Sequence, residues 1–244
     1  MKSRRGARHT AAFLLLLALG WPLTSAVAGV FSVTPVRLYM TPRDRAIAVT
    51  LTNEGDTDVV LQADIHSWAQ KPDGADELTL TEDLILAPPI IKLAPRARQV
   101  VRLALLKPAD PGRQLTYRLV VREVPEALPQ QPGVQLPIAL ALSMPVFITP
   151  PAAKRQVECT TSRAESSSVS LRCTNAGNAY AQIREARVQR AEQVLARFEG
   201  GSYLLPGASK AISLKGEQPL APGAAQLTVT FDDGQSITQG ITLP

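Results

Sequence analysis

The sequence predicts an all-β protein built of two β-sandwich domains, and three observations support this fold class. Beyond residue 28 no helical period of ten or more residues is found, whereas short alternating runs bounded by Gly, Pro, Asn and Asp recur. The chain after residue 28 is long enough for two domains of about a hundred residues each. A proline-containing break near residue 150 divides these runs into two groups.

Residues 1–28 have the pattern of a cleaved signal peptide. A basic head precedes a short apolar run, and the small-residue triplet Ala26-Val27-Ala28 follows at the distance a signal peptidase needs. The alternative is a membrane anchor, but the run is too short to span a bilayer. We therefore expect cleavage after Ala28, export, and no integral membrane segment in the mature protein.

Charge gives no support to nucleic-acid binding. The whole chain has 26 Lys and Arg against 21 Asp and Glu, which gives a pI near 9.5. Four of these cations lie in the predicted signal peptide, so the mature chain is nearly neutral. No basic cluster interleaved with aromatic residues indicates a nucleic-acid surface.

Residues 29–148 predict the first domain, an immunoglobulin-like sandwich. Seven strands in about 120 residues is the count typical of that fold. The predicted strands are 31–40, 46–53, 59–68, 84–93, 98–106, 115–124 and 134–147.

Residues 149–154 predict a short linker, because Pro150 and Pro151 interrupt the alternation. Residues 155–244 predict a second, smaller immunoglobulin-like sandwich whose last two strands are joined by a hairpin turn at residues 232–235. Its predicted strands are 156–160, 169–174, 179–190, 193–198, 210–214, 226–231 and 236–243.

Cys159 and Cys173 are the only cysteines, and they lie on the first two predicted strands of the second domain. An even cysteine count in an exported chain predicts a disulfide, worth about 3 kcal/mol in the chain-entropy model. The only histidines are His9 and His66. Too few ligands remain for a zinc or copper site, so we expect no metal and no cofactor.

Catalytic motifs are missing from the sequence. No nucleophile elbow, P-loop, dinucleotide fingerprint, HExxH or EF-hand loop is present. Carboxylates such as Asp83 and Glu123 stand alone, and isolated acids in a β-rich chain are usually solvated or ion-paired. We therefore expect a protein that is not an enzyme.

The segment 134–147 alternates large apolar residues with small, polar or proline residues. This alternation is also typical of an ordinary core strand, and that alternative stays open. Pro137 and Pro145 have the same parity, so both remove an N–H on the same side of the strand. The pattern predicts an edge strand, open or only partly paired, and a long apolar edge invites pairing with another chain.

Several motifs, in this order, resemble the periplasmic chaperones of the chaperone/usher pathway of pilus assembly over essentially the whole mature chain. The motifs are residues 33–38 (VTPVRL), Asn53, 87–90 (APPI), 93–95 (LAP), 99–103 (QVVRL), 117–125 (YRLVVREVP) and 175–179 (NAGNA).

The resemblance implies two immunoglobulin-like domains set as a boomerang in the periplasm of a Gram-negative bacterium. It implies that pilus or fimbrial subunits bind along the last strand of the first domain by donor-strand complementation, a named example of β-strand addition, and pass to an outer-membrane usher. Four large aliphatic side chains could stabilise the complex by about 6–12 kcal/mol before ordering costs. The side chains lent to the subunit would be Leu136, Ile138, Leu140 and Leu142.

Departures from the family pattern point to its divergent, archaic branch. Pro145 stands where the best-known members carry a lysine that helps to anchor the subunit's C-terminal carboxylate. Of the interdomain ion-pair triad, the resemblance keeps only Arg102, with Gln114 and Thr149 at the other two positions.

Arg37 matches the family's anchoring arginine, and strand register predicts its partner. Antiparallel pairing of the strands 115–124 and 134–147 brings a residue between 115 and 118 opposite Pro145, and Arg118 lies at that end. We expect Arg37 and Arg118 to grip the subunit carboxylate, because guanidinium groups bind carboxylates bidentately. Alternatively, Arg118 is an exposed residue paired with an acid, which would leave Arg102 and Arg122 as candidates.

A structural protein is the competing function, either a pilus subunit or an adhesin built from two sandwiches. Such a subunit should carry a free alternating N-terminal extension to donate. Residues 31–40 are short and contain Pro35, so they favour a strand that is integrated into a domain.

Overall fold

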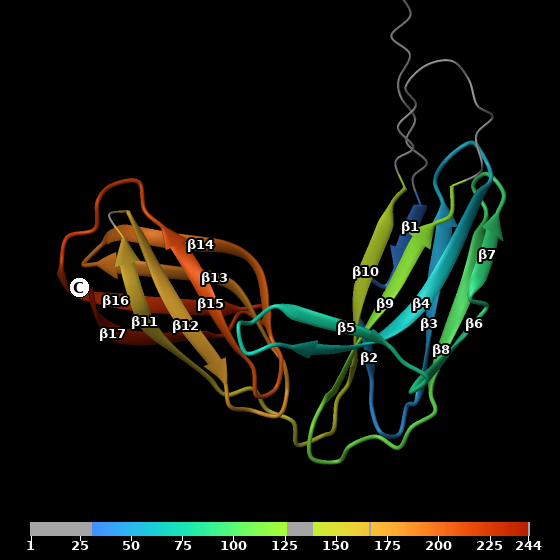
Figure 1. Ribbon diagram of the computed structural model, residues 1–244, viewed down its shortest axis with the longest axis horizontal. Coiled ribbons are helices and arrows are strands. Elements are labelled where there is room, and N and C mark those ends of the chain that lie inside the picture. The colour runs from blue at the N-terminus through green and yellow to red at the C-terminus, as the bar shows by residue number, and fades with distance from the viewer. Residues whose placement is uncertain (1–30, 126–138, 166, 244) are drawn as a thin grey trace, which may run out of the picture.

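The computed structural model describes residues 31–125, 139–165 and 167–243 and contains strands and no helix in these ranges. Two β-sandwiches lie at an angle to each other, so the molecule has the shape of a boomerang (Figure 1). The all-β prediction with two sandwiches is confirmed. The expected signal peptide, residues 1–28, and residues 134–138 of the predicted strand 134–147 lie outside the described residues.

The N-terminal sandwich consists of two sheets. One has the strand order β1-β3-β8-β6, and the other has the order β2-β10-β9-β4-β5 with β7 also paired to β4. The strands are β1 (Phe31–Thr34), β2 (Leu38–Met40), β3 (Ala46–Asn53), β4 (Val59–Gln70), β5 (Asp76–Leu80), β6 (Leu84–Ala87), β7 (Ile90–Leu93), β8 (Arg98–Leu105), β9 (Leu115–Glu123) and β10 (Ala141–Ile148).

Two segments that the sequence predicted as single strands each divide between the sheets. Residues 31–40 form β1, which pairs with β3, and β2, which runs parallel to β10. Residues 84–93 form β6, which pairs with β8, and β7, which pairs with β4. The breaks fall at Pro35 and at Pro88-Pro89, because proline cannot donate to a β-ladder. The first crossover places Arg37 where the two sheets meet.

The sequence missed β5, whose five residues are all exposed and therefore lack a buried apolar alternation. The hairpin formed by β4 and β5 reaches towards the C-terminal sandwich (Figure 1). There the Gln70 side chain donates to the carbonyl of Tyr203 and accepts from the amide of Leu205, both at 2.9 Å. The hairpin thus ties the two sandwiches together.

Strand β10 is an edge strand over only part of its length. Val146, Phe147 and Ile148 pair with β2, whereas residues 141–145 have no described strand on the side away from β9. The Leu140 carbonyl accepts from Glu123 of β9, and the Thr149 amide donates to Met40 of β2. Odd-numbered backbone groups of β10 therefore face away from β9, and so does the missing N–H of Pro145.

The C-terminal sandwich is one curled sheet with the order β11-β12-β15-β14-β13-β16-β17. Its halves meet at the single pair Arg197 and Lys215. The seven predicted strands and the hairpin turn between the last two are confirmed, with shifted ends. The strands are β11 (Val157–Glu165), β12 (Ser168–Asn175), β13 (Ala181–Arg190), β14 (Gln193–Leu204), β15 (Ser209–Lys215), β16 (Gly223–Phe231) and β17 (Ser236–Leu243).

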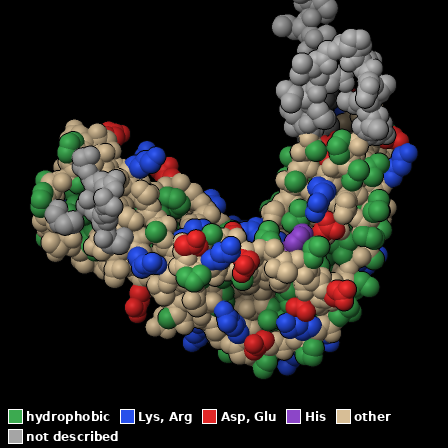
Figure 2. All heavy atoms as spheres, viewed as in Figure 1, with side chains coloured by type: hydrophobic (Ala, Val, Ile, Leu, Met, Phe, Trp, Pro, Cys, Tyr) green, Lys and Arg blue, Asp and Glu red, His purple; other side chains and the backbone are tan. Residues whose placement is uncertain are grey.

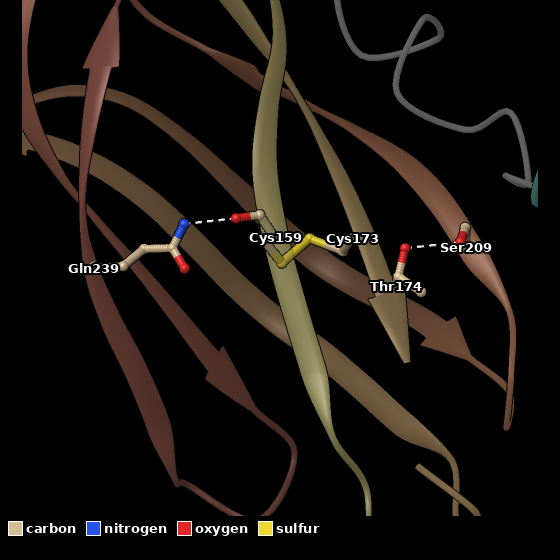
Figure 3. Close-up of a disulfide and its surroundings, with 5 residues drawn as sticks. All are labelled: Cys159, Cys173, Thr174, Ser209 and Gln239. Atoms are coloured by element: carbon tan, nitrogen blue, oxygen red, sulfur yellow. Dashed lines mark hydrogen bonds between the residues drawn. A yellow bond between two sulfur atoms is a disulfide. The ribbon is translucent and has the colours of Figure 1, made fainter. Parts of the chain in front are cut away.

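The predicted disulfide is present. Cys159 of β11 lies directly opposite Cys173 of β12, and their sulfur atoms are bonded at 2.01 Å (Figure 3). Both residues are buried in the core of the C-terminal sandwich. The Gln239 side chain of β17 donates to the Cys159 carbonyl at 2.5 Å, so the disulfide-bonded pair is also tied to the opposite edge of the sheet (Figure 3).

A third apolar cluster, between the two sandwiches, is aromatic. Its buried members are Trp68, Phe147 and Leu205, and Tyr180 and Tyr203 pack against them. The rings of Phe147 and Tyr180 stack with their centroids 4.0 Å apart and their planes within 6°. Phe147 comes from β10, so the junction between the sandwiches is continuous with the end of that strand.

Candidate functional site

The two predicted anchor residues lie at the junction of the sandwiches. Arg37 lies in the crossover between β1 and β2, and Arg118 lies on β9. The charges of both guanidinium groups act on the Tyr203 hydroxyl, where they oppose the increase in pKa that burial causes. The fold therefore brings to one aromatic ring two cations that are far apart in the sequence.

Arg118 lies opposite Pro145 in the pairing of β9 with β10, which confirms the register predicted from the sequence. On its other side Arg118 pairs with His66 of β4, and His66 pairs with Leu80 of β5. These four residues form a row across four strands, on the sheet face opposite the core. Figure 2 shows charged side chains gathered at the bend of the molecule.

Arg118 has no carboxylate partner among the described residues. Its guanidinium carbon lies 3.7 Å from the centroid of the Trp68 ring and 5.3 Å from that of Tyr203. Its one hydrogen bond is long, at 3.4 Å, to the carbonyl of Ser143 on β10. Burial lowers the pKa of Arg118, and the charges of Tyr203 and Asp76 offset this only in part. A half-buried cation without a counterion is a candidate site for binding an anion.

Arg37 is already engaged. Its Nη1 donates to Oδ2 of Asp232 at 2.9 Å, and its Nη2 donates to Oε1 of Gln182 at 2.6 Å. Burial lowers the pKa of Arg37, but the neighbouring groups of Tyr39, Tyr203 and Asp232 outweigh burial and raise it overall. Asp232 and Gln182 belong to the C-terminal sandwich, and sequence reasoning did not find either of them.

Tyrosine hydroxyl groups continue this network. The hydroxyl of Tyr180 donates to Oδ2 of Asp232 at 3.1 Å and lies 2.9 Å from that of Tyr39. Burial, followed by Tyr39 and Asp232, raises the pKa of Tyr180. Three of the four tyrosines in the chain, Tyr39, Tyr180 and Tyr203, meet at this junction. No local sequence pattern predicts this cluster, because the three residues come from separate segments of the chain.

The predicted donor segment is only partly described. Leu136 and Ile138 lie outside the described residues. Leu140 is 37 % exposed, whereas Leu142 is half-buried and packs against the core of its own sandwich. Further along the strand, Met144, Val146 and Ile148 are buried in that core. The even-numbered apolar side chains of this segment are thus buried in the sandwich's own core from Met144 onward and are exposed to solvent at Leu140.

The remaining expected residues take separate places. Gln114 is buried, donates to Oγ1 of Thr149 at 2.6 Å and accepts from the Tyr180 amide, so a neutral network replaces an ion pair there. Arg102 is exposed on β8 in the other sheet, between Ala48 and Ala87. It does not join Gln114 and Thr149. Arg122 forms an ion pair with Asp64 at 2.6 Å.

Within the described ranges, the side chains of His, Cys, Asp and Glu form no group of three or more that could hold a metal ion. Nor do these residues form a helix of the length and apolarity needed to cross a bilayer.

Solved structures with this fold include several chaperones. A chain from the CsuC–CsuE chaperone–tip adhesion subunit pre-assembly complex, from archaic chaperone-usher Csu pili of Acinetobacter baumannii, has a TM-score of 0.64 at 18% identity, covering 87% of this chain and 98% of that one. The YadV chaperone has a TM-score of 0.61 at 17% identity, covering 87% and 99%. The E. coli chaperone DraB has a TM-score of 0.56 at 18% identity, covering 88% and 96%. At these identities the likeness shows the fold.

Among curated proteins, none matches the chain. A family model does, that of the pili and flagellar-assembly chaperones, PapD N-terminal domain, over residues 30–154. This stretch is about half of the chain and includes Arg37, Arg118 and the whole of β10. The description is that of an assembly chaperone and not of an enzyme. The protein belongs to the pili and flagellar-assembly chaperone family.

Proposed function

We propose that this protein is a periplasmic chaperone that binds pilus subunits by donor-strand complementation, caps them and delivers them to an outer-membrane usher. The observation that carries the proposal is the unpaired, half-buried guanidinium of Arg118 directly beside the open edge of β10. A strand-binding edge and an anion site side by side fit a partner that offers a β-strand ending in a carboxylate.

The donor strand is the first part of the proposal. Backbone groups of residues 141 and 143 face the open edge, and Pro145 contributes no N–H there. A client strand can pair along this edge, while the even-numbered side chains Leu136, Ile138, Leu140 and Leu142 fill its open core. Leu140 and the side chains before it would be lent most readily, because Leu142 already packs against its own sandwich.

The anchor is the second part. Arg118 lies level with Pro145, so it can take over the role of the absent lysine at the place where the client strand would end. Stacking on Trp68 orients the guanidinium plane, which favours a bidentate grip on a carboxylate. Arg37 would supply the second cation.

The outer face of the sheet β1-β3-β8-β6 is a candidate surface for the usher. An exposed sheet face is usually polar, yet the described part of this one is mostly uncharged apart from two arginines of β8, Arg98 and Arg102, for which no ion pair is found in the described ranges. An arginine framed by apolar residues is typical of protein interfaces. The exposed or partly exposed neighbours of Arg102 on this face are Ala46, Ala48, Thr50, Ile85, Ala87, Val100 and Ala104.

Export and domain limits belong to the same proposal. We infer a signal peptide over residues 1–28, an N-terminal domain over 29–148, a linker over 149–154 and a C-terminal domain over 155–244. The disulfide within the C-terminal sandwich fits an oxidising compartment such as the periplasm. The proline at position 145 and the neutral pair of Gln114 and Thr149 favour the archaic branch of the pathway.

Co-purification tests the proposal. The tagged chain is expressed in a Gram-negative periplasm together with the genes of its own locus, and the proteins that remain bound are identified by mass spectrometry. We expect a single pilus subunit in a one-to-one complex. A chain that binds no subunit and instead polymerises when it is purified alone would indicate the alternative, a structural pilus subunit or adhesin.

A further inference from the structure

The acidic residue that holds Arg37 comes from the other sandwich, and this has a consequence for client binding. We propose that Asp232 is an internal substitute for the client's C-terminal carboxylate: it occupies Arg37 in the unloaded chaperone, and a bound client replaces it. This exchange couples loading to the contact between the two sandwiches. The inference rests on the proposed function, since it requires a client that offers a carboxylate.

The geometry is that of an occupied carboxylate site. Asp232 lies 2.9 Å from Nη1 of Arg37, and only 12% of its side chain is exposed, against 32% for Arg37. The Tyr180 hydroxyl donates to the same oxygen, Oδ2, at 3.1 Å. A guanidinium and a phenol thus converge on one carboxylate oxygen, and these donors would serve an incoming carboxylate equally well.

Charge makes the two carboxylates competitors. A second carboxylate at Arg37 would lie close to Asp232 in a partly buried place, where like charges repel strongly. Arg118 favours the client carboxylate over Asp232, because Arg118 has no acidic partner in the described part of the chain. A client carboxylate placed between the two arginines gains both cations, whereas among the described residues Arg37 is the one cation that pairs with Asp232.

Movement of Asp232 would change the contact between the two sandwiches. Arg37 and Asp232 form the one ion pair that joins the two sandwiches in the described ranges. The neighbouring residue, Asp233, is held at 2.7 Å by Arg155, which follows the linker. The turn between β16 and β17 is therefore attached to the N-terminal sandwich through Asp232 and to the chain entering the C-terminal sandwich through Asp233.

Tyr180 connects the same oxygen to the donor strand. Its hydroxyl bonds to Asp232, and its ring stacks on Phe147, two residues after Pro145 on β10. A change at Asp232 thus reaches β10 through a rigid aromatic contact. By linkage, if client binding weakens this contact, then loss of the contact strengthens client binding by the same free energy.

The first experiment needs no client. Small-angle X-ray scattering is compared for the wild type, Asp232→Asn, Arg37→Ala and the double variant, with Asp233→Asn as the matched control one residue away. We expect the two single variants to broaden the distribution of interdomain distances to the same extent and the double variant to add nothing. Asp233→Asn should match the wild type. Scattering from Asp232→Asn that is identical to the wild type would overturn the proposal.

The second experiment uses the chaperone–subunit complex recovered from the periplasm. Its dissociation rate is measured by exchange against a labelled chaperone. We expect Asp232→Asn to slow dissociation about fivefold or more, because the competitor for Arg37 is gone, and Asp233→Asn to leave the rate unchanged. Faster dissociation would instead make Asp232 a residue that positions Arg37 and would overturn the exchange.

The two failures can be told apart. If no variant, the wild type included, yields a subunit complex, the proposed function is refuted, and with it the exchange. The scattering data would then still decide whether Asp232 holds the two sandwiches together.

Discussion

Pro145 of β10 and Arg118 of β9 lie directly opposite each other in the sheet. The position that lacks a backbone donor is therefore level with a guanidinium that lacks a counterion. The missing N–H of Pro145 faces the open edge of β10, and Arg118 stacks on Trp68 of β4 and donates to the Ser143 carbonyl of β10. Under the proposed function, a client strand would end at this pair.

Arg118→Ala should lower the yield of subunit from the periplasm by about tenfold while the chaperone level stays normal, because a charged hydrogen-bonding partner of the client carboxylate is lost. Arg37→Ala should act in the same direction. Immunoblots of both proteins measure the effect. Arg122→Ala is the control, since Arg122 lies on the same strand but is paired with Asp64. Wild-type yield with Arg118→Ala would remove this residue from the anchor.

Leu140→Asp should leave the chaperone folded and abolish subunit recovery, because Leu140 is 37 % exposed in the free protein but would enter the apolar groove of the client. Ile138→Asp should have the same effect on recovery. Circular dichroism and co-purification measure folding and binding separately. Met144→Asp is the contrasting variant: it places a charge in the sandwich's own core and should unfold it. Full subunit yield with Leu140→Asp would place the donor strand elsewhere.

Replacing Cys159 and Cys173 together with alanine should destabilise the C-terminal sandwich by about 3 kcal/mol, because the closed loop between them restricts the unfolded chain. Urea unfolding followed by site-specific hydrogen exchange measures this loss in the C-terminal sandwich, with the N-terminal sandwich as internal control. Thiol counting on the denatured, non-reduced protein should find no free sulfhydryl, and two free sulfhydryls would disprove the bond.

Gln114→Glu should destabilise the protein by about 1–3 kcal/mol, because it buries a carboxylate beside Thr149 with no cation to pair with it. Adding Thr149→Arg should recover part of the loss by supplying that cation. A double-mutant cycle of unfolding free energies measures the coupling. If Thr149→Arg were equally harmful with Gln114 and with Glu at that position, the two sites would not be coupled.

Stability should fall above about pH 10. Burial, and then the hydrogen bond to Asp83, raises the pKa of Tyr117, so the folded state keeps this proton after the unfolded chain has released it. The contribution is complete below the ordinary tyrosine pKa and is lost as the pH rises beyond it. Tyr117→Phe should flatten the decline, and Tyr180 and Tyr203, whose pKa values are also raised, should account for what remains. Urea midpoints between pH 8 and 11 measure the slope, and equal slopes for both proteins would contradict the assignment.

Local features of the sequence determined most of the secondary structure. Alternation predicted the seven strands of the C-terminal sandwich, and the two cysteines predicted their own bond. The shared parity of Pro137 and Pro145 predicted an edge that is open or only partly paired, and hairpin register predicted that a residue between 115 and 118 lies opposite Pro145, where the structure places Arg118. These predictions succeeded because each depends on residues close in sequence or on a single strand pairing.

Tertiary structure alone decided the surroundings of the anchor residues. The splitting of residues 31–40 between two sheets depends on where β3 and β10 offer free edges, which no local pattern shows. The ion pair between Arg37 and Asp232 joins residues 195 positions apart, and it forms only because the two sandwiches meet at this angle. Packing between domains has no sequence period, so Arg118 could be placed opposite Pro145 from the sequence, but its lack of a counterion could not be foreseen.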